Sequence, residues 1–232
     1  MKKDFLAVSD YSPTDLQEML DLAVKLKKEH FNGGNKPEFK GKTLAMVFQK
    51  PSLRTRMSFD MAMRHMGGDA LYISPNEIGL GQRESVADVA RVISGYVDIM
   101  MARVFAHDHV LELAKWSSIP VINGLSDYNH PCQAMADALT IQEKFGNLKD
   151  INVTFLGDGN NVAVSLMHIC AKLGANFTIA SNEGYDITPK AIEAARPFAS
   201  ASGGTLTFIR DAHTAVHHAH VIYTDTWTSI GH

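Results

Sequence analysis

The rest of the chain is organised around the segment Gln49-Lys-Pro-Ser-Leu-Arg-Thr-Arg56. An apolar, strand-prone run at 43–48 leads into it, and a methionine-rich run with helical spacing follows. We therefore predict a strand-to-helix turn, in which the proline ends the strand and Ser52 caps the helix. The free N–H groups of the first helical turn favour an anion, and Arg54 and Arg56 add guanidinium groups suited to phosphate or carboxylate oxygens. A surface helix start with two solvated arginines is the alternative.

The composition excludes several classes of protein. The 232 residues suffice for one large domain or two modest ones, and 45% hydrophobic residues are ordinary for a globular protein. A formal net charge of −3 gives no general attraction for nucleic acid or an acidic membrane surface, so any anion site must be local. The sequence contains no apolar run long enough to span a bilayer and no signal-peptide pattern.

The cysteines and histidines give no metal or disulfide signature. Cys132 and Cys170 have neither a zinc-like spacing nor enough partners for a disulfide framework. We therefore expect a reducing, cytoplasmic location, no metal and no cofactor. Histidines gather at 213–220, where ordinary exposed residues are favoured over a metal site. Cys132 is expected to be a small packed residue rather than a catalytic thiolate.

Periodicity predicts alternating strands and helices in the first half of the chain. An amphipathic helix is expected from Pro13 to His30, a glycine-broken loop at 76–84, and a helix that opens at His130-Pro-Cys-Gln133 and runs to about Phe145. Strands are expected at 43–48, 70–73, 97–102 and 119–122, and helices after Ser52, at 85–95 and at 107–116. Strands and helices in this alternation predict a parallel sheet with helices on both faces.

The pattern restarts after a polar, turn-rich joint at 146–150. Strands are expected at 151–156, 176–180, 205–209 and 220–223, and helices at 162–173, 189–199 and 212–217. The predicted fold class is therefore α/β, with two doubly wound parallel-sheet domains, 1–146 and 147–232, and an active-site cleft between them.

Polar side chains follow several of the predicted strands. In doubly wound sheets, ligands gather beyond the carboxyl ends of the strands. The side chains expected at this edge of the first sheet are Ser52, Arg54, Thr55, Arg103, His130 and Gln133. Their convergence favours a functional anion site over a solvated helix start.

Gly157-Asp-Gly-Asn-Asn161 in the second half is a partial dinucleotide-binding fingerprint. It has two of the three glycines, and Glu183 lies where an acid could bind a ribose. Three interpretations stay open: a nicotinamide site, a plain tight turn, and an amino-acid site that uses the amides of Asn160 and Asn161.

Together these motifs resemble the aspartate/ornithine carbamoyltransferase family, and its ornithine branch in particular. The segments that carry the resemblance are Ser52-Leu-Arg-Thr-Arg56, Arg103, His130-Pro-Cys-Gln133, Gly157–Asn161 and Asp225-Thr-Trp-Thr-Ser229-Ile-Gly231. It extends over the chain from about residue 4 onward. The first motifs are shared with family members that use aspartate, acetylornithine or putrescine. The segment beginning at Asp225 favours ornithine, because a carboxylate suits its cationic amino group.

The resemblance implies two sets of binding residues. It implies that carbamoyl phosphate is bound by Ser52, Leu53 (mainly through its backbone), Arg54, Thr55, Arg103, His130 and Gln133. It implies that L-ornithine is held by Asn161, Asp225, Ser229 and Ile230, the last standing where the family usually has methionine. The catalytic residues would be Arg54, Thr55, Arg103 and His130. The family also implies a homotrimer, or a multiple of trimers, in which loop 76–83 of a neighbouring subunit completes the site.

The reaction implied is transfer of the carbamoyl group from carbamoyl phosphate to the side-chain amine of L-ornithine, giving citrulline and phosphate, as in arginine biosynthesis. The alternatives are a carbamoyltransferase for acetylornithine, putrescine or aspartate, a non-catalytic scaffold that only binds carbamoyl phosphate, and an NAD-dependent oxidoreductase. The sequence ends at His232, before the His-Cys-Leu-Pro motif of typical family members. On that ground the 232-residue chain alone is expected to be marginal or inactive unless another chain supplies the remainder.

Overall fold

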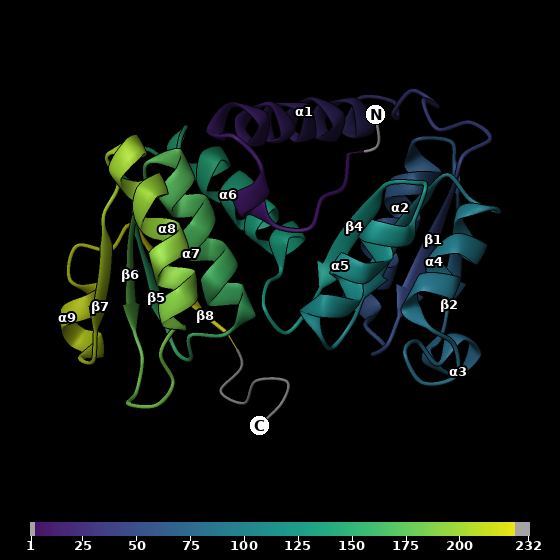
Figure 1. Ribbon diagram of the computed structural model, residues 1–232. Coiled ribbons are helices and arrows are strands. Elements are labelled where there is room, and N and C mark those ends of the chain that lie inside the picture. Colours follow the sequence, from purple (N-terminus) through teal and green to yellow (C-terminus); the bar gives the residue numbers. More distant parts are fainter. Residues whose placement is uncertain (1–2, 226–232) are drawn as a thin grey trace. The chain divides into compact units, whose positions relative to one another are not determined.

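A computed structural model describes residues 3–225, which divide into two compact units. Among these residues the first unit comprises 3–6 and 23–127, and the second comprises 7–22 and 128–225. Each unit contains a four-stranded, wholly parallel sheet with helices packed on it (Figure 1). The predicted α/β class with two parallel sheets is confirmed. The domain boundary expected after residue 146 stays a prediction.

The first sheet has the strand order β2-β1-β3-β4. Its strands are β1 (Thr43–Phe48), β2 (Asp69–Ile73), β3 (Ile99–Arg103) and β4 (Val121–Leu125), and its main helices are α2 (Leu53–His65), α4 (Val86–Ser94) and α5 (His107–Trp116). Successive side chains of a strand point to opposite faces. Ala45 and Val47 pack with α4 and α5, whereas Met46 and Phe48 pack with Met63 of α2. This is why β1 is apolar from Leu44 to Phe48.

Two elements of the first unit differ from the sequence prediction. The expected loop at 76–84 contains a one-turn helix, α3 (Pro75–Ile78), which a capping box between Ser74 and Glu77 stabilises. The strand expected at 119–122 is β4, which begins at Val121 and continues to Leu125, so that it includes the polar residue Asn123. Asn123 is fully buried, and its side chain donates a hydrogen bond of 3.0 Å to the carbonyl of Leu6.

The second sheet has the strand order β7-β6-β5-β8. Its strands are β5 (Asn152–Leu156), β6 (Asn176–Ala180), β7 (Leu206–Ile209) and β8 (Val221–Thr224), and its helices are η1 (Val8–Asp10), α6 (Pro131–Phe145), α7 (Asn161–Leu173), α8 (Pro189–Ser202) and α9 (Ala212–Val216). Helix α1 (Pro13–Phe31) is divided between the two units. The helices α7 and α8 lie side by side (Figure 1), and residues 162–172 of α7 are buried continuously. The predicted strands and helices of this half are confirmed within a few residues.

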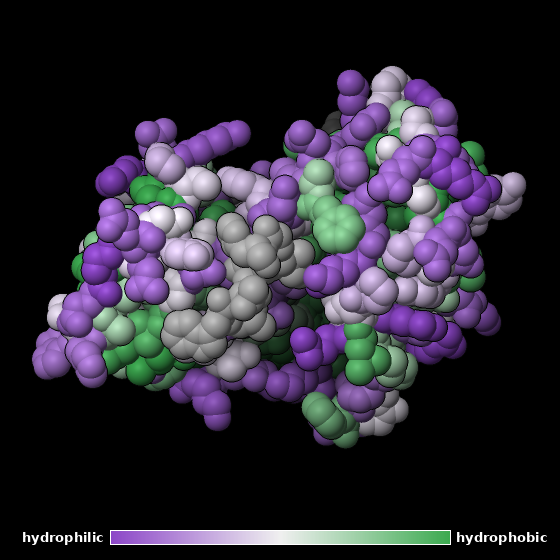
Figure 2. Space-filling model, turned by 90° about the horizontal axis from the view of Figure 1, so that it is seen from below, coloured by the Kyte–Doolittle hydropathy of each residue, from purple (hydrophilic) through white to green (hydrophobic). Residues whose placement is uncertain are grey.

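The surface carries both polar and apolar side chains. The face drawn in Figure 2 is mainly hydrophilic, with smaller hydrophobic areas between the polar side chains. Among the described residues, none of the helices combines the length and the hydrophobicity needed to cross a membrane.

Candidate active site

The turn after β1 forms the start of α2, as the sequence predicts. Ser52 has an extended backbone, and its hydroxyl accepts a hydrogen bond of 3.4 Å from the backbone N–H of Thr55. Ser52 therefore caps the helix, and the other N–H groups of the first turn have no partner inside it. Leu53 is 77% exposed at this helix start. The helix dipole adds partial positive charge at the same place.

Arg103 lies beside this helix start because β3 pairs with β1. Phe48, the last residue of β1, is in register with Arg103, and the next residue, Gln49, donates its backbone N–H to the carbonyl of Arg103 at 2.9 Å. The Nη1 atom of Arg103 donates to the Thr55 hydroxyl at 3.3 Å. The pairing of β3 with β4 is irregular here: Ala102 pairs with Asn123 and Arg103 pairs with Leu125, so Gly124 between them is skipped. A Cβ at Gly124 would lie 2.5 Å from the sulfur of Met101. Irregularities of this kind re-aim side chains at the ends of strands.

The guanidinium of Arg103 is buried without a carboxylate. Its side chain is 9% exposed, and Nε is buried with no hydrogen-bond partner among residues 3–225. Burial lowers the pKa of Arg103 below its ordinary value, and the positive charge of nearby Arg54 lowers it further. Within the same residues neither arginine forms an ion pair. Two cations held close together, with free N–H groups beside them, favour binding of an anion.

The two arginines of the opening motif have different surroundings. Arg54 is exposed and lies near Arg103. Arg56 stacks over the ring of Tyr72, with its Cζ atom 4.3 Å from the ring centroid. The sequence suggested that both guanidinium groups face the anion, and the structure assigns one of them to a cation–π contact.

Gln49 connects three segments around this turn, a role that the sequence did not reveal. Its Nε2 atom donates to the carbonyl of Leu80 at 3.1 Å, and its Oε1 atom accepts from the backbone N–H of Phe105 at 2.8 Å. The Nδ1 atom of His109 lies 3.3 Å from the same oxygen. Gln49 therefore ties the end of β1 to the loop after α3 and to the segment after Arg103.

In the second unit, Ser165 of α7 connects two predicted site residues. The backbone N–H of His130 donates to the Ser165 hydroxyl at 2.8 Å, and this hydroxyl donates to the carbonyl of Asn161 at 2.9 Å. Ser165 is 1% exposed. It lies inside a continuous apolar run of α7, and helical periodicity alone gives no signal that it holds His130 in place.

Gln133 lies in the first turn of α6, and its amide contacts a carboxylate. The Nε2 atom donates to Oδ1 of Asp137 at 2.9 Å, one helical turn later. Burial raises the pKa of Asp137 to about 6; the hydrogen bond from Gln133 and the nearby Tyr223 side chain oppose this rise, and the negative charge of Asp225 adds to it. Burial also raises the pKa of Tyr223 above its ordinary value, and the negative charges of Asp137 and Asp225 raise it further.

Asp225 follows β8, beside the loop after β5. Asn160 caps α7 with its side-chain oxygen, which accepts from two backbone N–H groups at 3.0 Å, so its amide nitrogen points outward. That nitrogen donates to Oδ2 of Asp225 at 3.1 Å. Asn161 is the first residue of α7. Ser229 and Ile230, the other residues expected to hold ornithine, lie outside the described residues.

The Gly157–Asn161 loop is filled by its own chain, which argues against a dinucleotide site. The N–H of Gly159 donates to the carbonyl of Tyr185 at 2.7 Å. A Cβ at Gly159 would lie 2.1 Å from the backbone nitrogen of Ile187. In the dinucleotide fingerprint, the second glycine instead lets the backbone approach a pyrophosphate. The close approach at Gly159 is made to the segment after β6.

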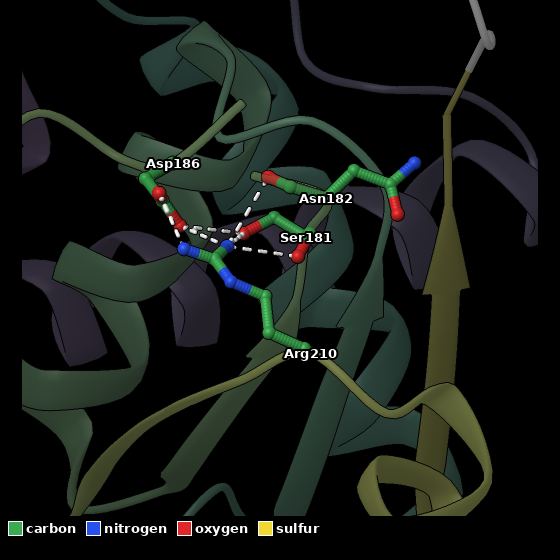
Figure 3. Close-up of polar contacts among 4 residues, drawn as sticks. All are labelled: Ser181, Asn182, Asp186 and Arg210. Atoms are coloured by element: carbon green, nitrogen blue, oxygen red, sulfur yellow. Dashed lines mark hydrogen bonds and ion pairs between the residues drawn. The ribbon is translucent and has the colours of Figure 1, made fainter. Parts of the chain in front are cut away.

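Arg210 fastens this covering segment (Figure 3). Its guanidinium donates to both carboxylate oxygens of Asp186, at 2.6 and 2.8 Å, and to the carbonyl of Ser181 at 2.9 Å. It also donates to the carbonyl of Asn182 at 3.1 Å, while the side chain of Asn182 points away. A planar guanidinium with several acceptors fixes the segment over Gly159.

Three observations on the described cysteine and histidine residues bear on thiol chemistry and metal binding. Burial raises the pKa of the Cys132 thiol to about 12, which disfavours the thiolate. The rings of His217 and His218 pack edge to face, with centroids 4.1 Å apart. Within residues 3–225 there is no group of three or more histidine, cysteine or acidic side chains that could hold a metal ion.

The predicted site residues thus form two groups, each described within its own unit. Ser52, Leu53, Arg54, Thr55 and Arg103 gather at the carboxyl edge of the first sheet. His130, Gln133, Asn161 and Asp225 belong to the second unit. The first group is suited to a phosphate. The second offers an imidazole, amides and a carboxylate, which suit neutral polar groups and an amine.

Comparison with known proteins identifies the family. Residues 3–143 match the carbamoyl-phosphate-binding domain of aspartate/ornithine carbamoyltransferases, and residues 149–232 match the aspartate/ornithine-binding domain of the same family.

Individual relatives agree with this. The ornithine carbamoyltransferase of Pyrococcus abyssi is 50% identical over 229 residues, which are 99% of this chain and 72% of the relative. The anabolic ornithine carbamoyltransferase of Pyrococcus furiosus is 48% identical over 99% of this chain and 73% of the relative. A solved structure of the Pyrococcus furiosus ornithine carbamoyltransferase superposes with a TM-score of 0.97 at 48% identity and covers 99% of this chain and 73% of that one. The chain therefore belongs to the aspartate/ornithine carbamoyltransferase family.

Proposed function

We propose that the chain is an ornithine carbamoyltransferase, which transfers the carbamoyl group of carbamoyl phosphate to the side-chain amine of L-ornithine and gives citrulline and phosphate. Relatives with about half of their residues identical bear that name. In the reaction the amine attacks the carbamoyl carbon, negative charge gathers on the carbonyl oxygen, and the bond to the phosphate oxygen breaks. Neither a covalent nucleophile nor a metal is required by this scheme.

The observation that carries the proposal is the buried guanidinium of Arg103, held by Thr55 and next to Arg54 without a carboxylate among the described residues. A dianionic phosphate would neutralise both cations and accept hydrogen bonds from the first turn of α2. In the proposed mechanism, Arg54 and Arg103 stabilise the departing phosphate, with Ser52 and the backbone of Leu53 completing its cradle.

The carbonyl oxygen of the carbamoyl group needs hydrogen-bond donors where its charge develops. We assign this role to Thr55 and His130, and assign the carbamoyl amino group to Gln133. Removal of one such donor raises the barrier by about 3 kcal/mol in comparable enzymes. Because Ser165 fixes the backbone of His130, it is a supporting residue of this arrangement.

Asn161, Asp225, Ser229 and Ile230 are proposed to hold L-ornithine. The carboxylate of Asp225 suits the α-amino group of ornithine, and Asn160 orients that carboxylate. An enzyme for aspartate would need positive charge at this place. We therefore prefer ornithine to aspartate, and also to acetylornithine, because the acetylated α-amino group of acetylornithine is uncharged.

Citrulline formation tests the proposal directly. The purified chain is incubated with carbamoyl phosphate and, in parallel, with ornithine, acetylornithine, putrescine or aspartate, and carbamoylated products are quantified. Ornithine is expected to give the highest kcat/KM. A clear preference for another amine would overturn the assignment of Asp225. Carbamoyl phosphate binding in a calorimeter without product from any amine would favour the non-catalytic scaffold.

Assembly and location are further parts of the proposal. We propose a homotrimer or a multiple of trimers, with loop 76–83 of one subunit completing the site of its neighbour, and a cytoplasmic location in arginine biosynthesis. Analytical ultracentrifugation at several protein concentrations tests the assembly.

A further inference from the structure

Asp137 is a partly buried acid that the proposed reaction does not use. It lies on α6 one turn after Gln133, so both side chains are on the same face of the helix. Its Oδ1 atom accepts the hydrogen bond of 2.9 Å from Nε2 of Gln133, and its Oδ2 atom is buried with no hydrogen-bond partner among residues 3–225. The titratable groups around the carboxyl come from three other segments: Tyr223 of β8, Asp225 after β8, and Cys170 of α7.

The partner of an amide decides which end of the amide faces a ligand. A glutamine side chain has a donor end, Nε2, and an acceptor end, Oε1. An ionised carboxylate can only accept, so it holds Nε2 and excludes the flipped orientation, in which two oxygens would face each other. With Nε2 on Asp137, the Oε1 atom of Gln133 is left to accept a hydrogen bond.

We propose that Asp137 is a positioning residue, which holds the Gln133 amide so that its oxygen accepts a hydrogen bond from the amino group of the carbamoyl donor. The inference rests on the proposed function, in which Gln133 contacts that group. It adds to the proposed function a physical basis on which the site distinguishes a carbamoyl group from an acetyl group. A carbamoyl group has N–H donors, whereas an acetyl group of nearly the same shape presents a methyl group and leaves the amide oxygen without a partner.

The charge of Asp137 makes the selection dependent on pH. With a pKa raised to about 6 by burial, the carboxyl is ionised at pH 8 and protonated at pH 5. The protonated acid has an O–H donor and can hold the Gln133 amide in the flipped orientation, with Nε2 toward the ligand. Discrimination between the two ligands is therefore expected to be full above about pH 7 and to decrease as the pH falls through about 6.

The test compares two ligands that differ only at the selected group. Carbamoyl phosphate and acetyl phosphate are titrated separately into the full chain by calorimetry at pH 8, and the ratio of their dissociation constants is the readout. Asp137→Asn keeps the shape but permits either orientation of the Gln133 amide. The variant is expected to lower the preference for carbamoyl phosphate about 5- to 10-fold, the worth of one hydrogen bond. Acetyl phosphate and inorganic phosphate should bind as in the unchanged protein.

Glu143→Gln is the matched control, because it removes one negative charge from an exposed position of the same helix. It should leave the ratio unchanged. A second measurement repeats the titrations of the unchanged protein from pH 8 to pH 5. The ratio should fall through about pH 6. Ionisation of the phosphate groups largely cancels in the ratio, since both ligands carry the same group.

The outcomes separate the two levels of the argument. An unchanged protein that binds neither phosphorylated ligand would overturn the proposed function itself. If it prefers carbamoyl phosphate and Asp137→Asn keeps the full preference, the positioning role is wrong while the function stands. Equal weakening of both ligands in the variant would indicate a merely structural role and also overturn the inference. Should the variant fail to fold, a ratio that does not change with pH in the unchanged protein would overturn it.

Discussion

Replacement of Arg54 by alanine should separate anion binding from stability. Arg54 is exposed at the start of α2 and forms no ion pair among the described residues, and its charge acts unfavourably on the buried guanidinium of Arg103. Removal of this side chain therefore takes away a repulsion and little packing. The free energy of unfolding should change by less than about 0.5 kcal/mol, as for most exposed positions.

The affinity for a phosphorylated ligand, unlike the stability, should decrease strongly in this variant. A hydrogen bond between a charged donor and a charged acceptor contributes about 1.5 to 3 kcal/mol. Its loss corresponds to a dissociation constant raised about 10- to 150-fold. We expect Arg54→Ala to lose this affinity for both carbamoyl phosphate and inorganic phosphate, because the phosphate is the group recognised. Calorimetry measures the affinity, and thermal unfolding without ligand measures the stability.

Arg56→Ala is the matched control on the same helix. Its guanidinium stacks 4.3 Å from the ring centroid of Tyr72, so its removal should lower the free energy of unfolding by about 0.5 to 1 kcal/mol and leave phosphate affinity nearly unchanged. Arg54→Ala should therefore lower the phosphate affinity but not the stability, whereas Arg56→Ala should lower the stability but not the phosphate affinity. If Arg54→Ala bound phosphate normally, or if Arg56→Ala weakened binding more, the anion site would not be where we place it.

Three further substitutions test the second unit. Ser165→Ala removes the hydroxyl that accepts the His130 N–H, so kcat should fall, and the free energy of unfolding measured in urea should decrease by about 1 to 3 kcal/mol. An unchanged kcat would show that this contact does not position His130. Gly159→Ala places a Cβ within 2.1 Å of the backbone of Ile187 and should destabilise the protein by about 2 kcal/mol or more, a value that a near-native melting temperature would contradict. In the folded protein the pKa of Asp137 is about 6, compared with 3.8 in the unfolded chain, so the stability that its protonated form contributes is lost as the pH rises from about 4 to above 6. This pKa difference corresponds to about 3 kcal/mol in the free energy of unfolding. Over this pH range the free energy of unfolding of Asp137→Asn, measured by chemical unfolding, should rise relative to that of the unchanged protein by up to that amount.

Local chemistry made much of the fold predictable. Hydrophobic spacing and turn residues located the helices and strands, since each depends on neighbours within a few residues. The two misplaced stretches have identifiable causes. Asn123 is polar, but its buried amide nitrogen donates to the carbonyl of Leu6 in the N-terminal segment. Helix α3 depends on a capping box that was overlooked inside a glycine-rich loop.

The candidate site was predictable only as a set of residue types. Local reasoning predicted the cap at Ser52, which the structure shows, and an anion contact for Arg54, which stays a prediction. It also assigned Arg56 to the anion, whereas its guanidinium stacks on Tyr72. Gln49 and Ser165 were missed because their partners lie far away in sequence.

Three features follow from the sequence without the structure: the α/β alternation, the capped turn after the first strand and the motifs of the family. Each depends only on consecutive or regularly spaced residues. Only the tertiary structure decided which strands are neighbours. The order β2-β1-β3-β4 places Arg103 beside the start of α2, and the approach of Ile187 to Gly159 fills the loop that resembled a dinucleotide site. Such contacts depend on strand order and register over the whole sheet, which the spacing of residues within one segment does not encode.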